Sequence, residues 1–358
     1  MTGSFGKIVA IAFPTLAAIV LPGPLCAEPG PVAAKVEATL PTATGQPRQF
    51  AFDGNLDTGY VSSRNASEND HFSLVLEKPV SATLVLAVTG RPNGEDELEA
   101  GVLEVSADGR SFEPFAKFED GTARGDLRGR EVRALRIRPE FATGHPLAVR
   151  ELTLVSDPPV TRFRYPVEFI ADVADAPEMK PWAENVARVC ERTYAMINDE
   201  LKTAGDRPPH WVVMSLKKSY DGVAMAGGGR ITGSVRYFKE HPDDVGAMVH
   251  ESVHIVQRYP GNSNPSWLVE GVSDYIRFFK FEPAKLGRID ARRAHYNQSY
   301  RVSAAFLAYL TDTYDKQIVP KLNRIMRAEK YDAKVFEEWT GKTLPALDDE
   351  WRATLSRK

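Results

Sequence analysis

Residues 248–257 read Met248-Val249-His250-Glu251-Ser252-Val253-His254-Ile255-Val256-Gln257. They lie in a predicted helix of about residues 242–260. Because helix residues four apart share a face, His250 and His254 can present ring nitrogens to one metal ion. Glu251 then lies beside a metal-bound water, where hydrolysis needs a general base. The spacing predicts a catalytic Zn²⁺ site; two histidines buried for structural reasons are the alternative.

A second predicted helix, beginning at Asn264-Pro265, carries Glu270 and Asp274 four residues apart. Two carboxylates in an otherwise apolar helix are costly unless they are paired or coordinated. A catalytic zinc site needs a third protein ligand, and Glu270 fits that role. Asp274 then accepts a hydrogen bond from a ligand histidine and orients its ring. Gly271 between them lets two helices approach closely; a solvated helix edge is the alternative.

The same residues carry a family resemblance. Residues 248–257 and 267–277, with 176–183 and 304–307, resemble the basic secretory protein family, which is grouped with gluzincin-type metallopeptidases. The likeness covers about residues 160–345. It implies a zincin-type metallopeptidase domain over residues 160–358, with a peptide or protein as substrate.

The resemblance also suggests the residue that stabilises the oxyanion. Hydrolysis needs a donor for the carbonyl oxygen as water attacks. In gluzincins a tyrosine ahead of an apolar helix fills this role, and Tyr300 opens the apolar stretch 300–310. Tyr300 is therefore the catalytic candidate, with Tyr296 and His295 as runners-up. A buried structural tyrosine is the alternative.

The two halves of the chain differ in pattern. From about residue 39 to 156, apolar and polar residues alternate as in β-strands, and Asp108-Gly109 is a strong hairpin signal. This indicates an all-β sandwich. After Asp157-Pro158-Pro159 the pattern changes to strands near 167–173, 210–216 and 230–238, a helix near 181–201, and mostly helix after Pro242. The second half is therefore an α+β domain.

One loop of the first half has the composition of a cation site. Asp53, Asn55, Asp57 and Thr58 supply oxygens around a glycine turn, and Glu151 on the last strand can complete a Ca²⁺ shell. An Asx turn closed by its own aspartates is the alternative.

A second resemblance covers this half. Residues 51–58, 105–112, 134–138 and 149–154 follow the order seen in discoidin (coagulation factor 5/8 type C) domains. It implies a galactose-binding-like jelly roll over residues 35–157, often with structural Ca²⁺, and makes a glycan a candidate ligand. Gly59-Tyr60 stands where that family usually has a tryptophan.

The N-terminus and the composition indicate where the protein is located and which classes of partner are excluded. Residues 1–27 have the basic, apolar and small-residue layout of a signal peptide, so we expect a secreted or periplasmic protein. A lipoprotein anchored on Cys26 is the weaker alternative. No later apolar run reaches 18 residues, so no stable membrane anchor is expected. With 45 Lys and Arg against 48 Asp and Glu, nothing favours nucleic-acid binding. Cleavage leaves Cys190 as the one cysteine, a predicted core residue.

Together these observations predict an exported zinc peptidase with an accessory β-sandwich for substrate or surface binding. The strand at 230–238, preceded by Gly227-Gly228-Gly229, is a candidate for binding an extended peptide by strand addition. The rival prediction is a glycan- or surface-binding protein whose metal site is structural or vestigial.

Overall fold

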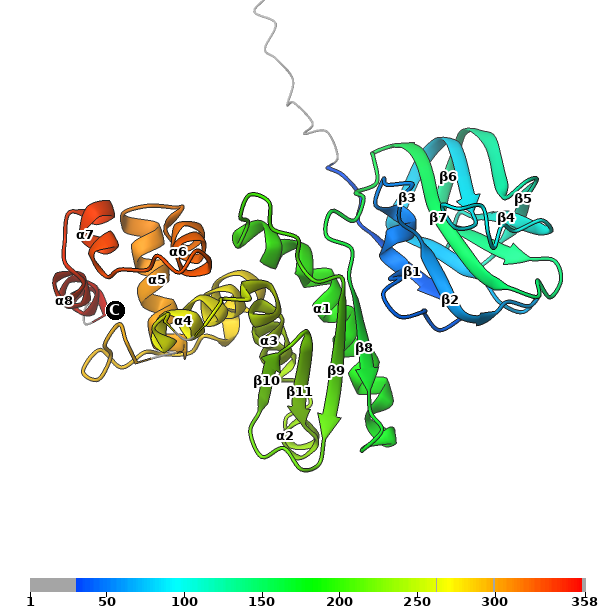
Figure 1. Cartoon of the computed structure of the whole chain (residues 1–358). Coiled ribbons are helices and arrows are strands. Elements are labelled where there is room, and N and C mark those ends of the chain that lie inside the picture. The colour runs from blue at the N-terminus through cyan, green and yellow to red at the C-terminus, as the bar shows by residue number, and fades with distance from the viewer. Residues whose placement is uncertain (1–29, 262, 299, 356–358) are drawn as a thin grey trace, which may run out of the picture.

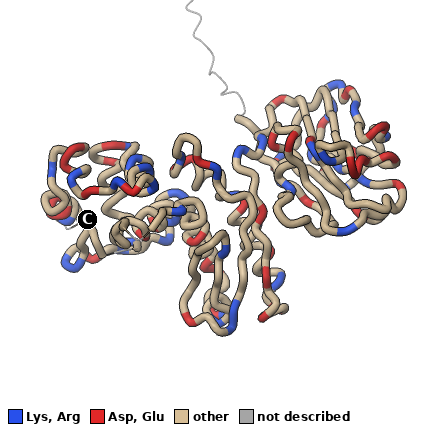
Figure 2. The backbone as a smooth tube through the Cα atoms, viewed as in Figure 1, with Lys and Arg blue, Asp and Glu red and all other residues tan. Residues whose placement is uncertain are grey.

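The computed structural model describes residues 30–261, 263–298 and 300–355, which form two domains side by side (Figure 1). The expected signal peptide, residues 1–27, lies outside the described residues. Within them, no helix combines the length and apolar character needed to cross a membrane. Lys and Arg are interspersed with Asp and Glu over both domains (Figure 2).

The first domain is the expected antiparallel β-sandwich. Its strands are β1 (Ala34–Ala38), β2 (Tyr60–Asn65), β3 (Phe72–Thr89), β4 (Gly101–Ser106), β5 (Glu113–Lys117), β6 (Thr122–Pro139) and β7 (Pro146–Asp157), with a short 3₁₀ helix η1 (Arg48–Phe52). They run in the order β2-β7-β3-β6-β4-β5, and β1 pairs with β3. Register shifts interrupt the long β3–β6 pairing, which lets these 18-residue strands bend around one apolar core.

The second domain begins with a four-stranded sheet. β8 (Glu168–Asp172), β9 (Trp211–Lys217), β10 (Ala224–Gly227) and β11 (Arg230–Ser234) lie in the order β10-β11-β9-β8, with β10 antiparallel to the others. A 3₁₀ turn η2 (Pro177–Met179) leads into α1 (Lys180–Glu200), which packs against β8. Cys190 on α1 is fully buried and free, as predicted.

The remainder is helical, as predicted for the chain after Pro242. The helices are α2 (Val235–Glu240), α3 (Val245–Gln257), α4 (Ser266–Ile276), a π-helical turn η3 (Arg277–Phe281), η4 (Pro283–Lys285), α5 (Tyr300–Thr313), α6 (Ile318–Arg327), α7 (Lys334–Thr340) and α8 (Leu344–Leu355). In Figure 1 the sheet lies between the sandwich and helices α5–α8. This is the α+β arrangement expected for the second half.

One predicted element needs correction. The strand expected at 230–238 ends at Ser234, because the Ser234 hydroxyl accepts a hydrogen bond from the backbone N–H of Tyr237 and caps α2. The shortened strand β11 also lies inside the sheet, between β10 and β9. It therefore has no free edge, and the prediction that it binds a peptide by strand addition is wrong.

The two domains share a buried polar joint. Glu168 on β8 accepts hydrogen bonds from the Thr42 hydroxyl at 2.7 Å and the Arg48 backbone at 2.9 Å, and its Oε1 lies 3.0 Å from the Arg48 guanidinium. Backbone bonds also join Val32 to Pro159 and Thr161. The sandwich is thus fastened to the sheet of the second domain through ordered contacts.

Candidate metal centre

Helix α3 supplies the centre because nearly all of it is buried. It packs against α1, α4 and the strands β10 and β11. His250 is 7% exposed and Glu251 is 8% exposed, although both are polar. Buried polar side chains need partners, and these come from α4, whose residues Glu270 and Asp274 face α3 and contact His250.

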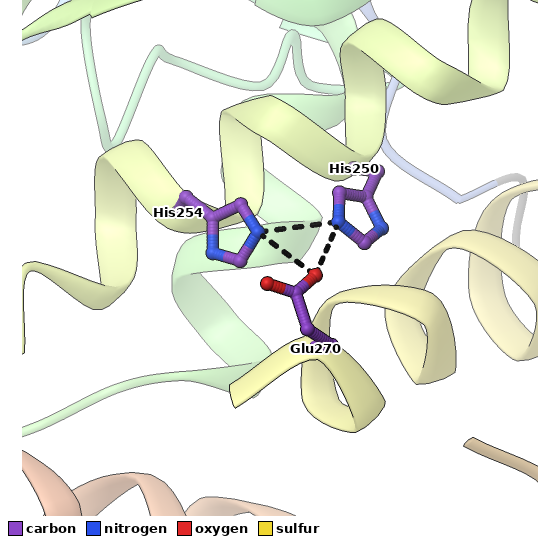
Figure 3. A group of neighbouring side chains, drawn as sticks. All are labelled: His250, His254 and Glu270. Carbon is purple, nitrogen blue, oxygen red and sulfur yellow. Dashed lines mark hydrogen bonds and ion pairs between the residues drawn. The ribbon is translucent and has the colours of Figure 1, made fainter. Parts of the chain in front are cut away.

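Three side chains converge at one point (Figure 3). The Nε2 atoms of His250 and His254 lie 3.2 Å apart. Oε2 of Glu270 lies 3.1 Å from the first and 3.5 Å from the second. In the described parts of the chain these form the one group of three or more His, Cys, Asp and Glu side chains that could hold a metal ion.

The donor set fits a divalent cation. Ligands about 2.0–2.1 Å from tetrahedral zinc are separated from one another by about 3.3 Å, close to the three distances observed here. The two Nε2 atoms face each other, and two lone pairs at 3.2 Å repel unless a proton or a cation lies between them. Two imidazoles and one carboxylate are also a common set of protein ligands for zinc.

The other ring nitrogen of each histidine is held by an acceptor. Nδ1 of His250 lies 2.6 Å from Oδ1 of Asp274, and Nδ1 of His254 lies 2.7 Å from Oε1 of Gln257. In the neutral ring, each contact places the proton on Nδ1 and leaves the Nε2 lone pair for a metal ion. Asp274 is only 3% exposed, so the structure places it against His250 and not at a solvated helix edge.

The close packing of these side chains shifts the pKa values of His250 and Glu270. Burial lowers the pKa of His250, but its hydrogen bonds to Asp274 and Glu270 outweigh that effect and raise the pKa to about 9. Burial raises the pKa of Glu270, yet hydrogen bonds from His250 and His254 bring it down to about 2. Glu270 is thus held as a carboxylate, the form that binds a metal.

Glu251 lies on the same turn of α3, directly after His250. Burial raises the pKa of its carboxyl, and the nearby His250 and His254 and a hydrogen bond from the Ala226 backbone oppose that shift. Glu251, His250 and Glu270 all line one cleft of about 1190 Å³. A carboxylate with a raised pKa beside an open cleft is suited to accept a proton.

The cleft is bounded on one side by the edge strand of the sheet. β10 has a single strand partner, β11, so its other edge is unpaired by strands. The Tyr220 hydroxyl donates to the Ala224 carbonyl at 3.1 Å on this strand. Val223 and Met225 are exposed apolar side chains that line the cleft. A peptide that joins the sheet on the side of this cleft must do so at β10 and not at residues 230–238.

Tyr300 borders the cleft, whereas the two runners-up are occupied elsewhere. The Tyr300 ring lies 6.1 Å from that of His250, and the residue is 56% exposed with a φ of 51°. The negative charge of Glu270, followed by partial burial, raises the pKa of its hydroxyl. Tyr296 packs against Trp267, and His295 pairs with Asp348 at 2.9 Å. Of the three, Tyr300 is the side chain that lines the cleft.

Sequence reasoning missed Gln257. A lone glutamine carries no metal-ligand signal, and its contact with His254 follows from the helix period, three residues later on α3.

The expected calcium loop of the sandwich is closed by its own side chains. Asp53 accepts hydrogen bonds from the Asn55 backbone at 2.8 Å and the Thr58 hydroxyl at 2.9 Å, while Asn55 accepts one from the Asp57 backbone at 3.1 Å. These are the contacts of Asx turns. Asn55 and Asp57 are exposed.

Glu151 on β7 meets this loop, as expected. Its Oε2 accepts the Gly54 backbone N–H at 3.1 Å, while its Oε1 is buried with no hydrogen-bond partner. Burial, together with the charge of Asp53, raises the pKa of Glu151 to about 7. An unpartnered buried oxygen beside a second carboxyl fits a hard cation such as Ca²⁺.

Comparison with solved structures finds similarity between the N-terminal region and several carbohydrate-binding modules. A family 32 module from a family 31 glycoside hydrolase of Clostridium perfringens is 20% identical over 34% of this chain and 92% of that one, with a TM-score of 0.30. The family 32 module of C. perfringens NanJ, solved with galactose, is 17% identical over 34% and 92%, with a TM-score of 0.29. A fucose-binding module of Streptococcus pneumoniae is 16% identical over 34% and 91%, with a TM-score of 0.30.

Comparison with protein families concerns the second domain. No curated protein matches the chain. Residues 178–352, which contain α3, α4 and α5, match a family described as "Peptidase of plants and bacteria". The resemblance drawn from residues 248–257 and 267–277 is thereby confirmed: residues 178–352 match the basic secretory protein family of peptidases.

Proposed function

We propose that the protein is an exported zinc-dependent peptidase in which His250, His254 and Glu270 hold the metal ion. The observation that carries the proposal is the set of ligand-atom separations of 3.1–3.5 Å, within a domain of a peptidase family. Bound zinc supplies a Lewis acid that polarises a water molecule and the scissile carbonyl.

The protein's own groups complete the reaction. Glu251 takes a proton from the attacking water and passes it to the leaving amine. Tyr300 donates its phenolic O–H to the carbonyl oxygen as negative charge develops there. An extended peptide lies along the edge of β10 that no other strand covers, with Val223 and Met225 contacting its apolar side chains.

Metal analysis and one substitution test this proposal. The purified full chain should contain one zinc per molecule and should cleave casein or members of a peptide library. Glu251→Gln should keep the zinc and lose about 10²–10⁴-fold in kcat. Full activity of Glu251→Gln, or a wild-type protein that binds no zinc, would contradict the proposal. A mass-spectrometric digest of the library would also define the cleavage preference.

We further propose that the sandwich binds Ca²⁺ at Asp53 and Glu151 and presents a glycan- or surface-binding site. The unpartnered Oε1 of Glu151 supports the cation. Because the sandwich is joined to the second domain through Glu168, the full chain is the right sample for a glycan array, with and without EDTA. Glycan binding by a protein that has no peptidase activity would favour the rival function, a binding protein with a vestigial metal site.

Export is proposed from residues 1–27 alone. Expression of the full chain, followed by N-terminal sequencing of the exported protein, should give a first residue at Glu28. A protein that stays inside the cell with its N-terminus intact would contradict this.

A further inference from the structure

His254 is held through the ring nitrogen that faces away from the metal centre. Its Nδ1 lies 2.7 Å from Oε1 of Gln257, the last residue of α3. Gln257 is 2% exposed, so water does not compete for this contact. No other side-chain oxygen approaches this nitrogen as closely among the described residues; the Ser273 hydroxyl is 3.4 Å away.

The second partner of Gln257 fixes the orientation of its amide. Nε2 of Gln257 donates to the backbone carbonyl of Val269 at 3.0 Å. A carbonyl only accepts hydrogen bonds, so the amide nitrogen must face Val269 and the amide oxygen must face His254. That oxygen in turn only accepts, so Nδ1 of His254 must carry the proton. The lone pair is then on Nε2, the atom that points at His250 and Glu270.

The same amide also joins two helices. Gln257 is on α3 with His254, and Val269 is on α4 directly before Glu270. A shift of α4 along α3 would break the hydrogen bond to Val269 before it separated Glu270 from His254. One buried side chain therefore links a histidine of the centre to the segment that carries its carboxylate.

His250 is oriented in a different way. Its acceptor is the carboxylate of Asp274, which needs no fixed orientation because both of its oxygens accept hydrogen bonds. Gln257 is neutral and can be flipped, so its effect on His254 depends on the Val269 carbonyl. Thus a charged side chain, Asp274, orients His250, and a neutral side chain, Gln257, orients His254. The amide of Gln257 is itself held by the backbone carbonyl of Val269.

We propose that Gln257 is a positioning residue of the metal centre. It sets the tautomer of His254 and holds the α3–α4 spacing at which His254 and Glu270 bind one zinc ion. This inference rests on the proposed zinc function, but it is tested by metal affinity and not by peptidase activity.

Two variants of the full chain separate the two roles. Gln257→Leu removes both hydrogen bonds, while Gln257→Glu keeps the volume and the acceptor for His254 but loses the donor to Val269. Gln49→Leu is the matched control, because Gln49 is another buried glutamine that bonds a backbone group, Val167, at the domain joint. Zinc dissociation constants are measured by competition with a chromophoric chelator.

We expect zinc binding to weaken about 10–100-fold in Gln257→Leu, by less in Gln257→Glu, and not at all in Gln49→Leu. In the zinc-loaded protein, the Nδ1–H resonance of His254 should exchange slowly with water in wild type and in Gln257→Glu. The same resonance should exchange rapidly in Gln257→Leu.

Wild-type zinc affinity and slow Nδ1–H exchange in Gln257→Leu would overturn the inference while leaving the proposed function intact. If Gln257→Leu fails to fold, Gln257→Met, which also lacks both hydrogen bonds but is unbranched like glutamine, decides the question, and wild-type zinc affinity in that variant would overturn the inference. A wild-type chain that binds no zinc would instead refute the proposed function, and this inference with it.

Discussion

Oδ1 of Asp274 lies 2.6 Å from Nδ1 of His250, and both side chains are buried. The two residues come from different helices, so this contact orients the first histidine and also fixes α4 against α3. Asp274→Asn keeps an oxygen that can accept the Nδ1 proton but removes the charge. We expect zinc affinity to fall about 10–100-fold, measured by chelator competition.

Asp312→Asn is the control for that substitution. Asp312 is on α5, its side chain is 76% exposed, and it pairs with Lys316 away from the centre. Its loss should leave zinc affinity unchanged. Equal affinity in Asp274→Asn and Asp312→Asn would show that the buried charge does not support the ligand.

Tyr300 should act on the rate and not on metal binding. Its φ of 51° is rare for a residue with a side chain and is part of what presents the ring beside His250. Tyr300→Phe should lower kcat about 10²–10³-fold, the effect of losing one oxyanion donor, with little change in KM or zinc content. Tyr296→Phe is the matched control, because Tyr296 packs against Trp267. Similar kcat values for the two variants would remove Tyr300 from the mechanism.

The domain joint should be a large contributor to stability. Glu168 is 4% exposed and bonds Arg48 and Thr42. Glu168→Ala leaves the Arg48 guanidinium without its closest carboxylate, which costs about 3–5 kcal/mol of unfolding free energy for a buried pair. Glu37→Ala breaks an exposed pair with Lys35 and should cost at most about 1 kcal/mol.

Urea unfolding followed by tryptophan fluorescence checks this prediction. All five tryptophans lie between residues 182 and 351, so the signal reports on the second domain. A lower urea midpoint in Glu168→Ala would show that the sandwich stabilises the second domain. Identical midpoints for Glu168→Ala and Glu37→Ala would contradict the prediction.

Cys190 should be chemically inert in the folded protein. Burial raises the pKa of its thiol to about 12, so the reactive thiolate is scarce at neutral pH. In a chain that begins at Glu28, Cys190 is the one cysteine. Ellman's reagent at pH 8 should react with no thiol in the native protein and with one in urea. Rapid reaction of the native protein would mean that α1 opens readily.

The pairs within each helix could be predicted from sequence because the helix period determines them. Residues four apart must share a face, which places His250 beside His254 and Glu270 beside Asp274. What a local pattern cannot give is how separate helices meet. The contact between Gln257 and Val269, and the position of β10 at the sheet edge, depend on the packing of segments that are distant in sequence.

In the sandwich, too, contacts between segments that are distant in sequence could not be predicted from the local pattern. Alternating residues predicted its strands, but the joint at Glu168 joins residues 120 or more positions apart, and neither Thr42 nor Arg48 carries a local signal for that contact. The calcium loop remains a prediction for a related reason. Its oxygens satisfy both an Asx turn and a cation site, and the unpartnered oxygen of Glu151 is visible only in the fold.

Gly271 allows a close approach between helices, as predicted, but the helix that approaches it is not the predicted one. We expected it to allow the two helices that share the metal ion to approach. The close approach is instead between α4 and α5: a Cβ at position 271 would lie 2.8 Å from Cβ of Ser303 and 3.5 Å from Leu307. The glycine therefore determines how α4, the helix that carries Glu270, packs on α5, which begins at Tyr300.

Gly271→Ala should be destabilising for this reason. Alanine favours a helix by about 1 kcal/mol over glycine, but overpacking against a fixed backbone typically costs about 1–3 kcal/mol, so we expect a net loss. Pushing α5 outward also moves Tyr300, so kcat should fall while zinc affinity stays near wild type. Ser303→Gly in the same chain removes the clashing Cβ and should restore kcat and the melting temperature toward the wild-type values. A Gly271→Ala protein with a raised melting temperature and full kcat would show that α4 and α5 do not need this close contact.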